Sequence, residues 1–351
     1  MELKKIKIGK RYIGEDCPCF IIAEAGVNHN GQFRLAKKLV DIAASAGVDA
    51  VKFQTFKAEG VVTADVDIAS YARKNNIGKD FKQLGMLKRC ELTYNEFKQL
   101  KKYCDQKKIL FLSTPHSFDA IDFLEDLVPM YKFGSGDLLN IPALQYAARK
   151  GKPMILGTGM ATLAEVRDAL KAIRAVGCNQ IIVLHCTTNY PCPIEEVNLR
   201  AMLAMQNTLN CLVGYSDHTM GLTVPIMAAT FGAVVIEKHF TLCKTLPGPD
   251  HMASLEPTEL KQMVIAIRNV ERALGSYAKK PTTIEKNILK LIRKSIVASK
   301  DIKKGALIRR NMLDIKRPGT GLPPTKIEYI LGKKTKRDIK KDELIKISLV
   351  E

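Results

Sequence analysis

The stretch Phe20–Glu24, which reads FIIAE, is the first of eight short apolar runs that decide the fold of this chain. Each run has the length and the apolar, often β-branched composition of a buried strand. In order, the runs are Phe20–Glu24, Ala50–Gln54, Ile109–Ser113, Tyr131–Ser135, Pro153–Gly157, Ile181–His185, Cys211–Tyr215 and Ala233–Glu237. Such runs predict strands that are covered on both faces, as in a parallel sheet.

Helix-period segments occupy the intervals between these runs. They include Leu35–Ala46, Tyr94–Gln106, Leu163–Val176 and Val224–Thr230, and three of them are followed by a glycine that favours a helix C-cap, namely Gly47, Gly177 and Gly232. Strands that alternate with helices are typical of an α/β protein. Eight such units in about 260 residues favour a closed (β/α)8 barrel, the TIM barrel, over an open doubly wound sheet. In addition, no GxGxxG follows the first run.

A second, smaller domain is predicted after the barrel. The helical segment Pro257–Leu274 ends at Gly275 and is followed by a polar stretch that contains proline. Beyond that stretch, short apolar segments separated by Lys-Gly and Pro-Gly turns indicate a mainly β module. We therefore expect a barrel domain at 1–278, a linker at 279–290 and a small β domain at 291–351.

The composition excludes several classes of protein. With 46% hydrophobic and 26% charged residues among 351, the chain is neither disordered nor fibrous. It contains no run of the ~18–20 uncharged apolar residues that a membrane helix needs, and its basic start, Met1–Arg11, leads into Cys17-Pro18-Cys19 rather than into an apolar signal segment. We expect a cytoplasmic protein that binds no membrane. The nine cysteines, odd in number and without a CxxC pair, are expected to be free, buried thiols.

The formal net charge of +19 is concentrated at one end of the chain. Residues 279–351 carry a net charge of +13, and residues 1–278 carry a net charge of +6. A basic excess of this size is compatible with nucleic acid, with an anionic membrane surface, with small anionic ligands or with a solvated charged surface. Tyr329 is the one aromatic residue beyond residue 280, so the module lacks the stacking surfaces of single-strand binders. We therefore expect small anionic ligands and no nucleic acid.

Polar side chains gather at the ends of the predicted strands, where the active site of a barrel enzyme forms. His218 and His239 end the last two strands beside the acids Asp217 and Glu237. Two imidazoles with neighbouring carboxylates suit a divalent cation that keeps open positions for water and substrate. Histidines that only make structural hydrogen bonds would give the same pattern, so the residues alone leave both interpretations open.

Two lysines, Lys52 and Lys132, lie inside apolar strands. Burying an unpaired ammonium is costly, so each is expected to face the mouth of the barrel and to meet an anion. Together with the hydroxyls of Thr114 and Ser135 they could hold a phosphate group. An internal ion pair, for instance Lys52 with Glu24, is the structural alternative. A Schiff-base aldolase or lyase, with either lysine as the nucleophile, is the chemical alternative.

Several longer strings resemble the sialic acid synthase family, in the same order and over the whole barrel. They are IAEAGVNHNG at 22–31, KFGSGD at 132–137, HCTTNYP at 185–191, GYSDH at 214–218, EKHFT at 237–241 and GPDH at 248–251. The C-terminal strings KDIKKG at 300–305 and KRPG at 316–319 resemble the antifreeze-like (SAF) domain that closes those synthases. The resemblance therefore extends nearly from end to end.

This resemblance implies the condensation of phosphoenolpyruvate with N-acetylmannosamine or a close relative, an N-acylated hexosamine. The products would be a nine-carbon 2-keto acid and phosphate. The resemblance also implies a divalent metal, with Mn²⁺ expected first and Mg²⁺ or Co²⁺ as alternatives. Finally, it implies a domain-swapped homodimer in which the C-terminal module of one chain covers the barrel of the other.

Positions in the matching strings imply individual roles. His218 and His239 would bind the metal, and Glu24, Asp217 and Glu237 would be catalytic carboxylates. The residues implied to contact phosphoenolpyruvate or the amino sugar are Lys52, Gln54, Thr114, Lys132, Ser135, Asn189, Tyr190, Ser216 and Asp250, together with Arg317, which would reach in from the second chain.

The chain departs from the family pattern at two places. The family often has serine before the Thr-Gly-Met of the fifth strand, where this chain has Gly157, which removes one expected phosphate donor. On the sixth strand, Thr188-Asn189-Tyr190 replaces the Asn-hydrophobic-Tyr of some sialic acid synthases. Together with Ala253–Pro257, this variant resembles the legionaminic acid branch, which uses 2,4-diacetamido-2,4,6-trideoxymannose. The residues leave the choice between the two sugars open.

Overall fold

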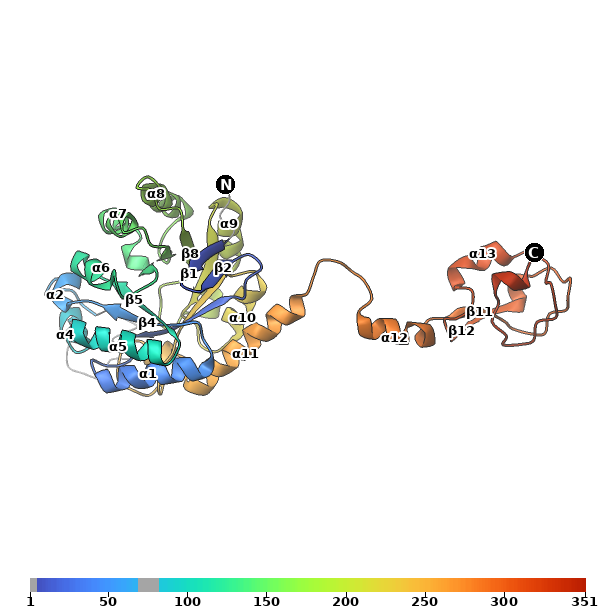
Figure 1. The fold of residues 1–351 in the computed structure, drawn as a ribbon, viewed down its shortest axis with the longest axis horizontal. Coiled ribbons are helices and arrows are strands. Elements are labelled where there is room, and N and C mark those ends of the chain that lie inside the picture. Colours follow the sequence, from blue (N-terminus) through green and yellow to red (C-terminus); the bar gives the residue numbers. More distant parts are fainter. Residues whose placement is uncertain (1–4, 69–81) are drawn as a thin grey trace. The chain divides into compact units, whose positions relative to one another are not determined.

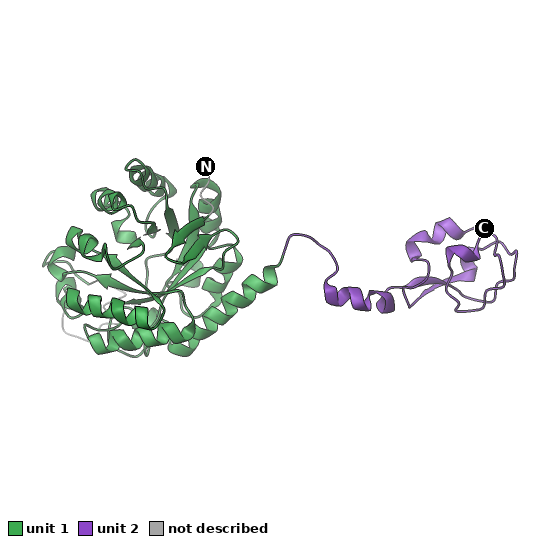
Figure 2. Ribbon diagram, viewed as in Figure 1, with its two compact units in different colours: residues 1–275 green, residues 276–351 purple. Residues whose placement is uncertain are grey.

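The computed structural model describes residues 5–68 and 82–351. The chain divides into two compact units, residues 1–275 and residues 276–351 (Figure 2). The first unit is built from alternating strands and helices, and the second has two short strands of its own among the described residues.

Eight parallel strands in the described part of the chain form the sheet of the first unit (Figure 1). They are β3 (Phe20–Gly26), β4 (Ala50–Thr55), β5 (Leu110–Pro115), β6 (Tyr131–Phe133), β7 (Met154–Gly157), β8 (Ile181–His185), β9 (Leu212–Asp217) and β10 (Val235–His239). Their hydrogen-bonded order is β5-β4-β3-β10-β9-β8-β7-β6, and β5 also contacts β6, so the sheet closes into a barrel. All eight predicted strands are confirmed, with ends that shift by at most two residues.

Helices surround this sheet and follow its strands in turn (Figure 1). The longer ones are α1 (Phe33–Ala46), α5 (Tyr94–Gln106), α6 (Phe118–Leu124), α7 (Ile141–Arg149), α8 (Leu163–Arg174), α9 (Arg200–Thr208), α10 (Thr223–Thr230) and α11 (Pro257–Leu274), and the short α2 (Ala58–Val61) and α4 (Gln83–Lys88) precede α5. Capping boxes at Thr93 and Thr162 begin α5 and α8, and Gly47 ends α1 in the left-handed conformation with φ of 80°. The TIM-barrel prediction is confirmed.

Alternation along the strands separates two apolar layers, because successive side chains point to opposite faces. Outward-facing residues such as Ile21, Val51 and Phe53 pack in one cluster with the buried faces of the helices. Inward-facing residues such as Ile22 and Leu112 fill the barrel interior.

A hairpin of β1 (Lys5–Ile8) and β2 (Arg11–Gly14), not expected from the sequence, closes the N-terminal end of the barrel. Its residues Ile6, Ile8 and Ile13 are buried in the interior cluster, together with Phe20 and Ala50, the first residues of β3 and β4. Polar side chains therefore collect at the opposite end, where the strands finish.

The second unit contains a helix at the place where a linker was expected. This helix, α12 (Thr283–Ile292), covers most of the range 279–290. It begins at a capping box in which the Thr282 hydroxyl accepts from the N–H of Glu285, while the Glu285 carboxylate accepts from the N–H of Thr282. Most of the residues assigned to the linker are therefore helical.

The rest of the second unit has a small core of its own. Strands β11 (Ser295–Ala298) and β12 (Leu313–Lys316) pair antiparallel, and the short helix α13 (Ile327–Ile330) packs with them. The core includes Ile296, Ile308, Ile339 and Ile345. This unit is mainly irregular, with isolated bridges in place of longer strands.

All nine cysteines lie in the described residues and are free thiols; six are buried, as expected, and Cys17, Cys211 and Cys243 are only half-buried. Within residues 5–68 and 82–351, every helix is too short or too polar to span a lipid bilayer.

Candidate active site

Alternate side chains of each strand point into the barrel, so polar side chains at the strand ends meet in one pocket at its C-terminal end. Residues two apart share a face, so Lys52 and Gln54 of β4 both face inward, as do Ser216 and His218 at the end of β9. The pocket is lined by Glu24, Lys52, Gln54, Thr114, His116, Lys132, Gly134, Ser135, Gly157, Cys186, Tyr190, Ser216, His218, Glu237 and His239. The structure thus brings together eleven of the residues that the sequence analysis selected.

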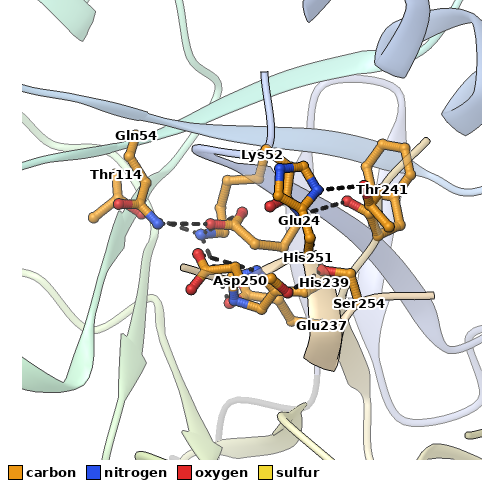
Figure 3. Close-up of polar contacts among 12 residues, drawn as sticks. Glu24, Lys52, Gln54, Thr114, Glu237, His239, Thr241, Asp250, His251 and Ser254 are labelled. Carbon is orange, nitrogen blue, oxygen red and sulfur yellow. Dashed lines mark hydrogen bonds and ion pairs between the residues drawn. The ribbon is translucent and has the colours of Figure 1, made fainter. Parts of the chain in front are cut away.

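Two buried lysines share this pocket with two carboxyl groups, as the close-up of Lys52, Glu24 and Glu237 illustrates (Figure 3). Lys52 Nζ lies 2.8 Å from Glu24 Oε2 and 3.6 Å from Glu237 Oε1. Lys132 Nζ lies 3.4 Å from the same Glu237 oxygen and donates to the carbonyl of Phe133 at 3.1 Å. The internal ion pair between Lys52 and Glu24, considered as an alternative to anion binding, is therefore present.

Burial and charge give the two carboxyl groups different protonation behaviour. Burial raises the pKa of Glu24 to about 7, although Lys52 acts in the opposite direction. Burial also acts to raise the pKa of Glu237, but Lys132 and Lys52 outweigh it and the pKa of Glu237 is lowered. The pocket thus holds one carboxyl that can exchange a proton near neutral pH beside one that stays ionised, as acid–base chemistry requires.

Hydroxyl groups and glycines form another part of the wall. Thr114 Oγ1 accepts from Lys52 Nζ at 3.2 Å. Ser135 Oγ accepts from the N–H of Gly159 at 3.0 Å. A Cβ atom on Gly157 would lie 3.0 Å from Ser135 Oγ, tighter than an ordinary contact. The Ser135 hydroxyl therefore occupies the space that a side chain at position 157 would need.

The rings of His218 and His239 lie in the pocket with their centroids 5.7 Å apart, and the ring of Tyr190 lies 4.1 Å from that of His218. His218 Nδ1 lies 2.6 Å from the carbonyl oxygen of Thr187, which places a proton on Nδ1 and leaves a lone pair on Nε2. His239 Nδ1 is buried without a hydrogen-bond partner among the described residues, 3.8 Å from Asp250 Oδ2. Figure 3 shows Asp250 beside His239.

This set of donors fits a divalent cation. Burial lowers the pKa of His218 to about 4 and that of His239 well below its usual value, so both rings are neutral at physiological pH, the form that binds metals. Glu237 Oε2 is likewise buried with no hydrogen-bond partner in the described chain. A cation bound by two imidazoles keeps further coordination positions open for water and for oxygen atoms of a substrate. Within the described ranges, no group of three or more His, Cys, Asp or Glu side chains is arranged to hold a metal ion.

Asp217 does not lie in the pocket, contrary to the expectation from the sequence. It stands between Ser216 and His218, which face inward, so strand alternation turns it outward. Its carboxylate is buried 2.5 Å from Lys238 Nζ and accepts from the N–H and hydroxyl of Thr219. Asp217 therefore joins β9 to β10 and contributes to the structure of the barrel wall.

Three more of the selected residues lie outside the lining of the pocket. Asp250 borders it through His239, Asn189 is half-buried in the loop after β8, and Arg317 is exposed in the second unit. Ser295 fixes the turn after Arg317, because its hydroxyl donates at 2.7 Å to the carbonyl of the adjacent proline.

Two side chains in the pocket, His116 and Cys186, were not among the selected residues. His116 stands two residues after Thr114, so the two-residue period of β5 would have identified it. Cys186 directly follows β8, and its Sγ lies 3.2 Å from Ser135 Oγ. Their position at the end of a strand was the feature of the sequence from which both could have been predicted as pocket residues.

The fold and the pocket define a TIM-barrel enzyme whose active site lies at the carboxyl ends of the strands. The chain belongs to the NeuB family, which matches residues 39–279, and a SAF domain matches residues 293–351. It is thus a member of the sialic, legionaminic and pseudaminic acid synthases, transferases that form a carbon–carbon bond. The resemblance predicted from the motifs is confirmed.

Named relatives cover almost the whole chain. Enzymes named N,N'-diacetyllegionaminic acid synthase are 46% identical in Legionella pneumophila, with 91% of each chain covered, and 44% identical in Campylobacter jejuni, with 93% of this chain and 98% of the relative covered. Human N-acetylneuraminate-9-phosphate synthase is 36% identical over 97% of this chain and 95% of its own length. A sialic acid synthetase from Leptospira borgpetersenii, crystallised with citrate, has a TM-score of 0.72 at 33% identity, with 81% of this chain and 94% of that chain covered.

Proposed function

We propose that this enzyme condenses phosphoenolpyruvate with an N-acylated hexosamine, giving a nine-carbon 2-keto acid and phosphate. The observation that carries the proposal is the pairing of two buried ammonium groups, Lys52 and Lys132, with two neutral imidazoles, His218 and His239, in one pocket. The first pair suits a phosphate and a carboxylate, and the second pair suits a cation that holds a carbonyl oxygen. The names of the relatives support the same class of reaction.

Phosphoenolpyruvate would bind at the side of the pocket that carries the lysines. Lys52 and Lys132 would neutralise its charge, and the hydroxyls of Thr114 and Ser135 would donate hydrogen bonds to it. The hydroxyl of Ser216, which donates to Glu237 Oε1 at 3.2 Å, would turn to the substrate on binding. An ammonium group has three donors, and Lys132 uses two of them for Glu237 and the carbonyl of Phe133, so one is left for an anion. Lys52 already contacts Glu24, Glu237 and Thr114 and would exchange one of these contacts for the anion.

The amino sugar would bind beside the histidines, against Glu24, Gln54, Tyr190 and Asp250. Asn189 lies in the same loop as Tyr190 and is proposed to contact the sugar as that loop adjusts. Arg317 is proposed to reach the acyl group from the module of a second chain in a domain-swapped dimer. Replacement of Arg317 by alanine should then raise the KM for the sugar and leave the KM for phosphoenolpyruvate unchanged.

His218 and His239 are proposed to hold a divalent metal. Mn²⁺ is the preferred candidate, and Mg²⁺ and Co²⁺ are the alternatives. Such an ion, when bound, supplies Lewis-acid polarisation of the sugar aldehyde. Glu237 stays ionised between the two lysines and would stabilise positive charge that develops on carbon 2 of phosphoenolpyruvate. Glu24, with a pKa near 7, would orient the water that adds at carbon 2 and take up its proton. Lys52 and Lys132 would stabilise the phosphate as it departs.

Two sugars are candidates for the second substrate. N-acetylmannosamine corresponds to N-acetylneuraminate synthase activity. The alternative, 2,4-diacetamido-2,4,6-trideoxymannose, is favoured by the higher identity to the two legionaminic acid synthases, 44% and 46%, than to the human enzyme, 36%.

Mass spectrometry of the products tests the proposal. Phosphoenolpyruvate is incubated with each sugar in turn, with Mn²⁺ present, and phosphate release is measured in parallel. A nine-carbon 2-keto acid formed in equal amount to the phosphate supports the synthase, and the sugar with the higher kcat/KM identifies the substrate. Trapping of a covalent keto-acid adduct by borohydride, with activity that survives EDTA, would contradict it in favour of a Schiff-base aldolase.

A further inference from the structure

His116 is a pocket residue that the proposed reaction leaves without a role. It follows β5, two residues after Thr114, so both side chains face the pocket. Its backbone N–H donates to the carbonyl of Thr55 at 3.1 Å, and the edge of its ring meets Phe56 at a centroid distance of 6.0 Å and an angle of 81°. Of the His116 side chain, 23% is exposed, so the ring can meet a ligand in the pocket.

Charged groups act on this ring from three elements. Asp137, in the 3-10 turn Ser135–Asp137, has Oδ2 at 3.8 Å from His116 Nδ1. Lys52 of β4 and Lys132 of β6 act from the pocket. Burial lowers the pKa of His116, the lysines lower it further, and Asp137 offsets this in part. The ring is therefore neutral at physiological pH when no anion occupies the pocket.

The turn that carries Asp137 also carries a proposed phosphate ligand. Ser135 and Asp137 are the first and last residues of one turn, which presents the Ser135 hydroxyl to the pocket and the carboxylate to His116. A phosphate dianion at Thr114, Lys132 and Ser135 would add negative charge beside the ring and favour its protonated form. A protonated imidazole donates from both nitrogens, so one can serve Asp137 and the other the anion.

We propose that His116 is a further binding residue for the phosphate group of phosphoenolpyruvate, protonated while the phosphate is bound and oriented by Asp137. The inference rests on the proposed function and adds to it that substrate binding takes up a proton. The same protonated ring would add positive charge at the phosphate as its bond to carbon 2 breaks. Affinity for phosphoenolpyruvate should accordingly fall as the pH rises above neutral, because the bound ring loses its proton.

Calorimetric titration in buffers of different ionisation enthalpy counts the protons taken up on binding. We would titrate phosphoenolpyruvate, and separately inorganic phosphate, into the wild type and into His116→Gln, Asp137→Asn and Thr114→Val. Relative to the wild type, His116→Gln should bind about tenfold more weakly at neutral pH, the loss of one charge-assisted hydrogen bond, and should take up fewer protons. Thr114→Val is the matched control, because it removes a donor that does not titrate and should weaken binding with proton uptake unchanged.

The protonation of the phosphate itself is common to all four proteins, so differences between them report on the side chains. Asp137→Asn should reduce proton uptake although the His116 ring is still present. If His116→Gln does not fold, this variant alone tests whether His116 takes up the proton. Equal affinity and equal proton uptake in the wild type, His116→Gln and Asp137→Asn would overturn the inference. Phosphate binding with uptake that depends on His116, but no product from phosphoenolpyruvate, would refute the proposed function alone. Product formation with uptake independent of His116 would refute the role of His116 alone.

Discussion

Replacing Lys238 by methionine should destabilise the barrel by about 3–5 kcal/mol. Lys238 Nζ lies 2.5 Å from Asp217 Oδ2, and both side chains are fully buried. Methionine has a similar length and leaves little cavity, but the Asp217 carboxylate then remains buried without a counter-charge. The carbonyl oxygen of Thr219 loses its lysine donor as well.

Urea denaturation followed by far-ultraviolet circular dichroism measures this loss, because the chain has no tryptophan to serve as a fluorescent probe. The control is Lys101→Met. Lys101 pairs with Asp105 at 2.7 Å on the surface of α5, where the Asp105 side chain is 59% exposed, so its removal should cost less than about 1 kcal/mol. The double variant Asp217→Asn/Lys238→Met should recover most of the stability, because no unpaired charge stays buried.

A loss in Lys238→Met no larger than that in Lys101→Met would refute the argument. It would mean that water or another group compensates the Asp217 carboxylate. A double variant as unstable as the single one would instead place the effect in packing and not in charge.

Three other predictions concern the pocket. Burial holds the pKa of Glu24 at about 7, above its usual 4.5, so the folded state binds an extra proton and the wild type should lose stability as the pH rises from 4.5 to 7. Glu24→Gln should remove that decline. Urea midpoints that fall in parallel for both proteins would contradict the prediction. His218→Ala should abolish product formation and weaken Mn²⁺ binding, measured by electron paramagnetic resonance, with the fold intact; activity retained in EDTA would refute the metal role. In Gly159→Ala the new Cβ would overlap Thr188 Oγ1 and lie 2.9 Å from Ser135 Oγ, so a higher KM for phosphoenolpyruvate is expected, and unchanged kinetics would count against the phosphate role of Ser135.

The barrel could be predicted from sequence because eight apolar runs alternate with helical segments at regular intervals, a pattern that few folds share. Most of the pocket followed from the same reasoning, since parallel strands bring their carboxyl ends to one side. The hairpin Lys5–Gly14 was missed, although its alternation of lysine and isoleucine is typical of a strand, because it makes no βα unit. Helix α12 was missed because the residues before it, 276–282, are polar and contain a proline, and this character was extended to 290, although the capping box at Thr282 and the five Ile and Leu residues of the helix were readable.

The direction in which a side chain points was harder to predict than the set of residues that lie near the pocket. Asp217 was selected for its position beside a histidine, but strict alternation along β9 should have assigned it to the outer face. The contact of Lys52 with Glu24 depends on the register of β4 against β3, which sets these two residues opposite each other. A single sequence carries no information on that register, and distances across the barrel have no local signal at all.

The pairing of β3 with β10 sets Phe20 opposite Val235 and so joins the first strand of the barrel to the last. During synthesis on the ribosome, β3 emerges long before its neighbour on that side, and closing so long a segment is entropically slow. Until then the free edges of the growing sheet, on β3 and on its newest strand, are exposed and open to association with other chains. The C-terminal unit is translated after β10, so its synthesis delays release of the chain and gives the barrel time to close while it is still tethered.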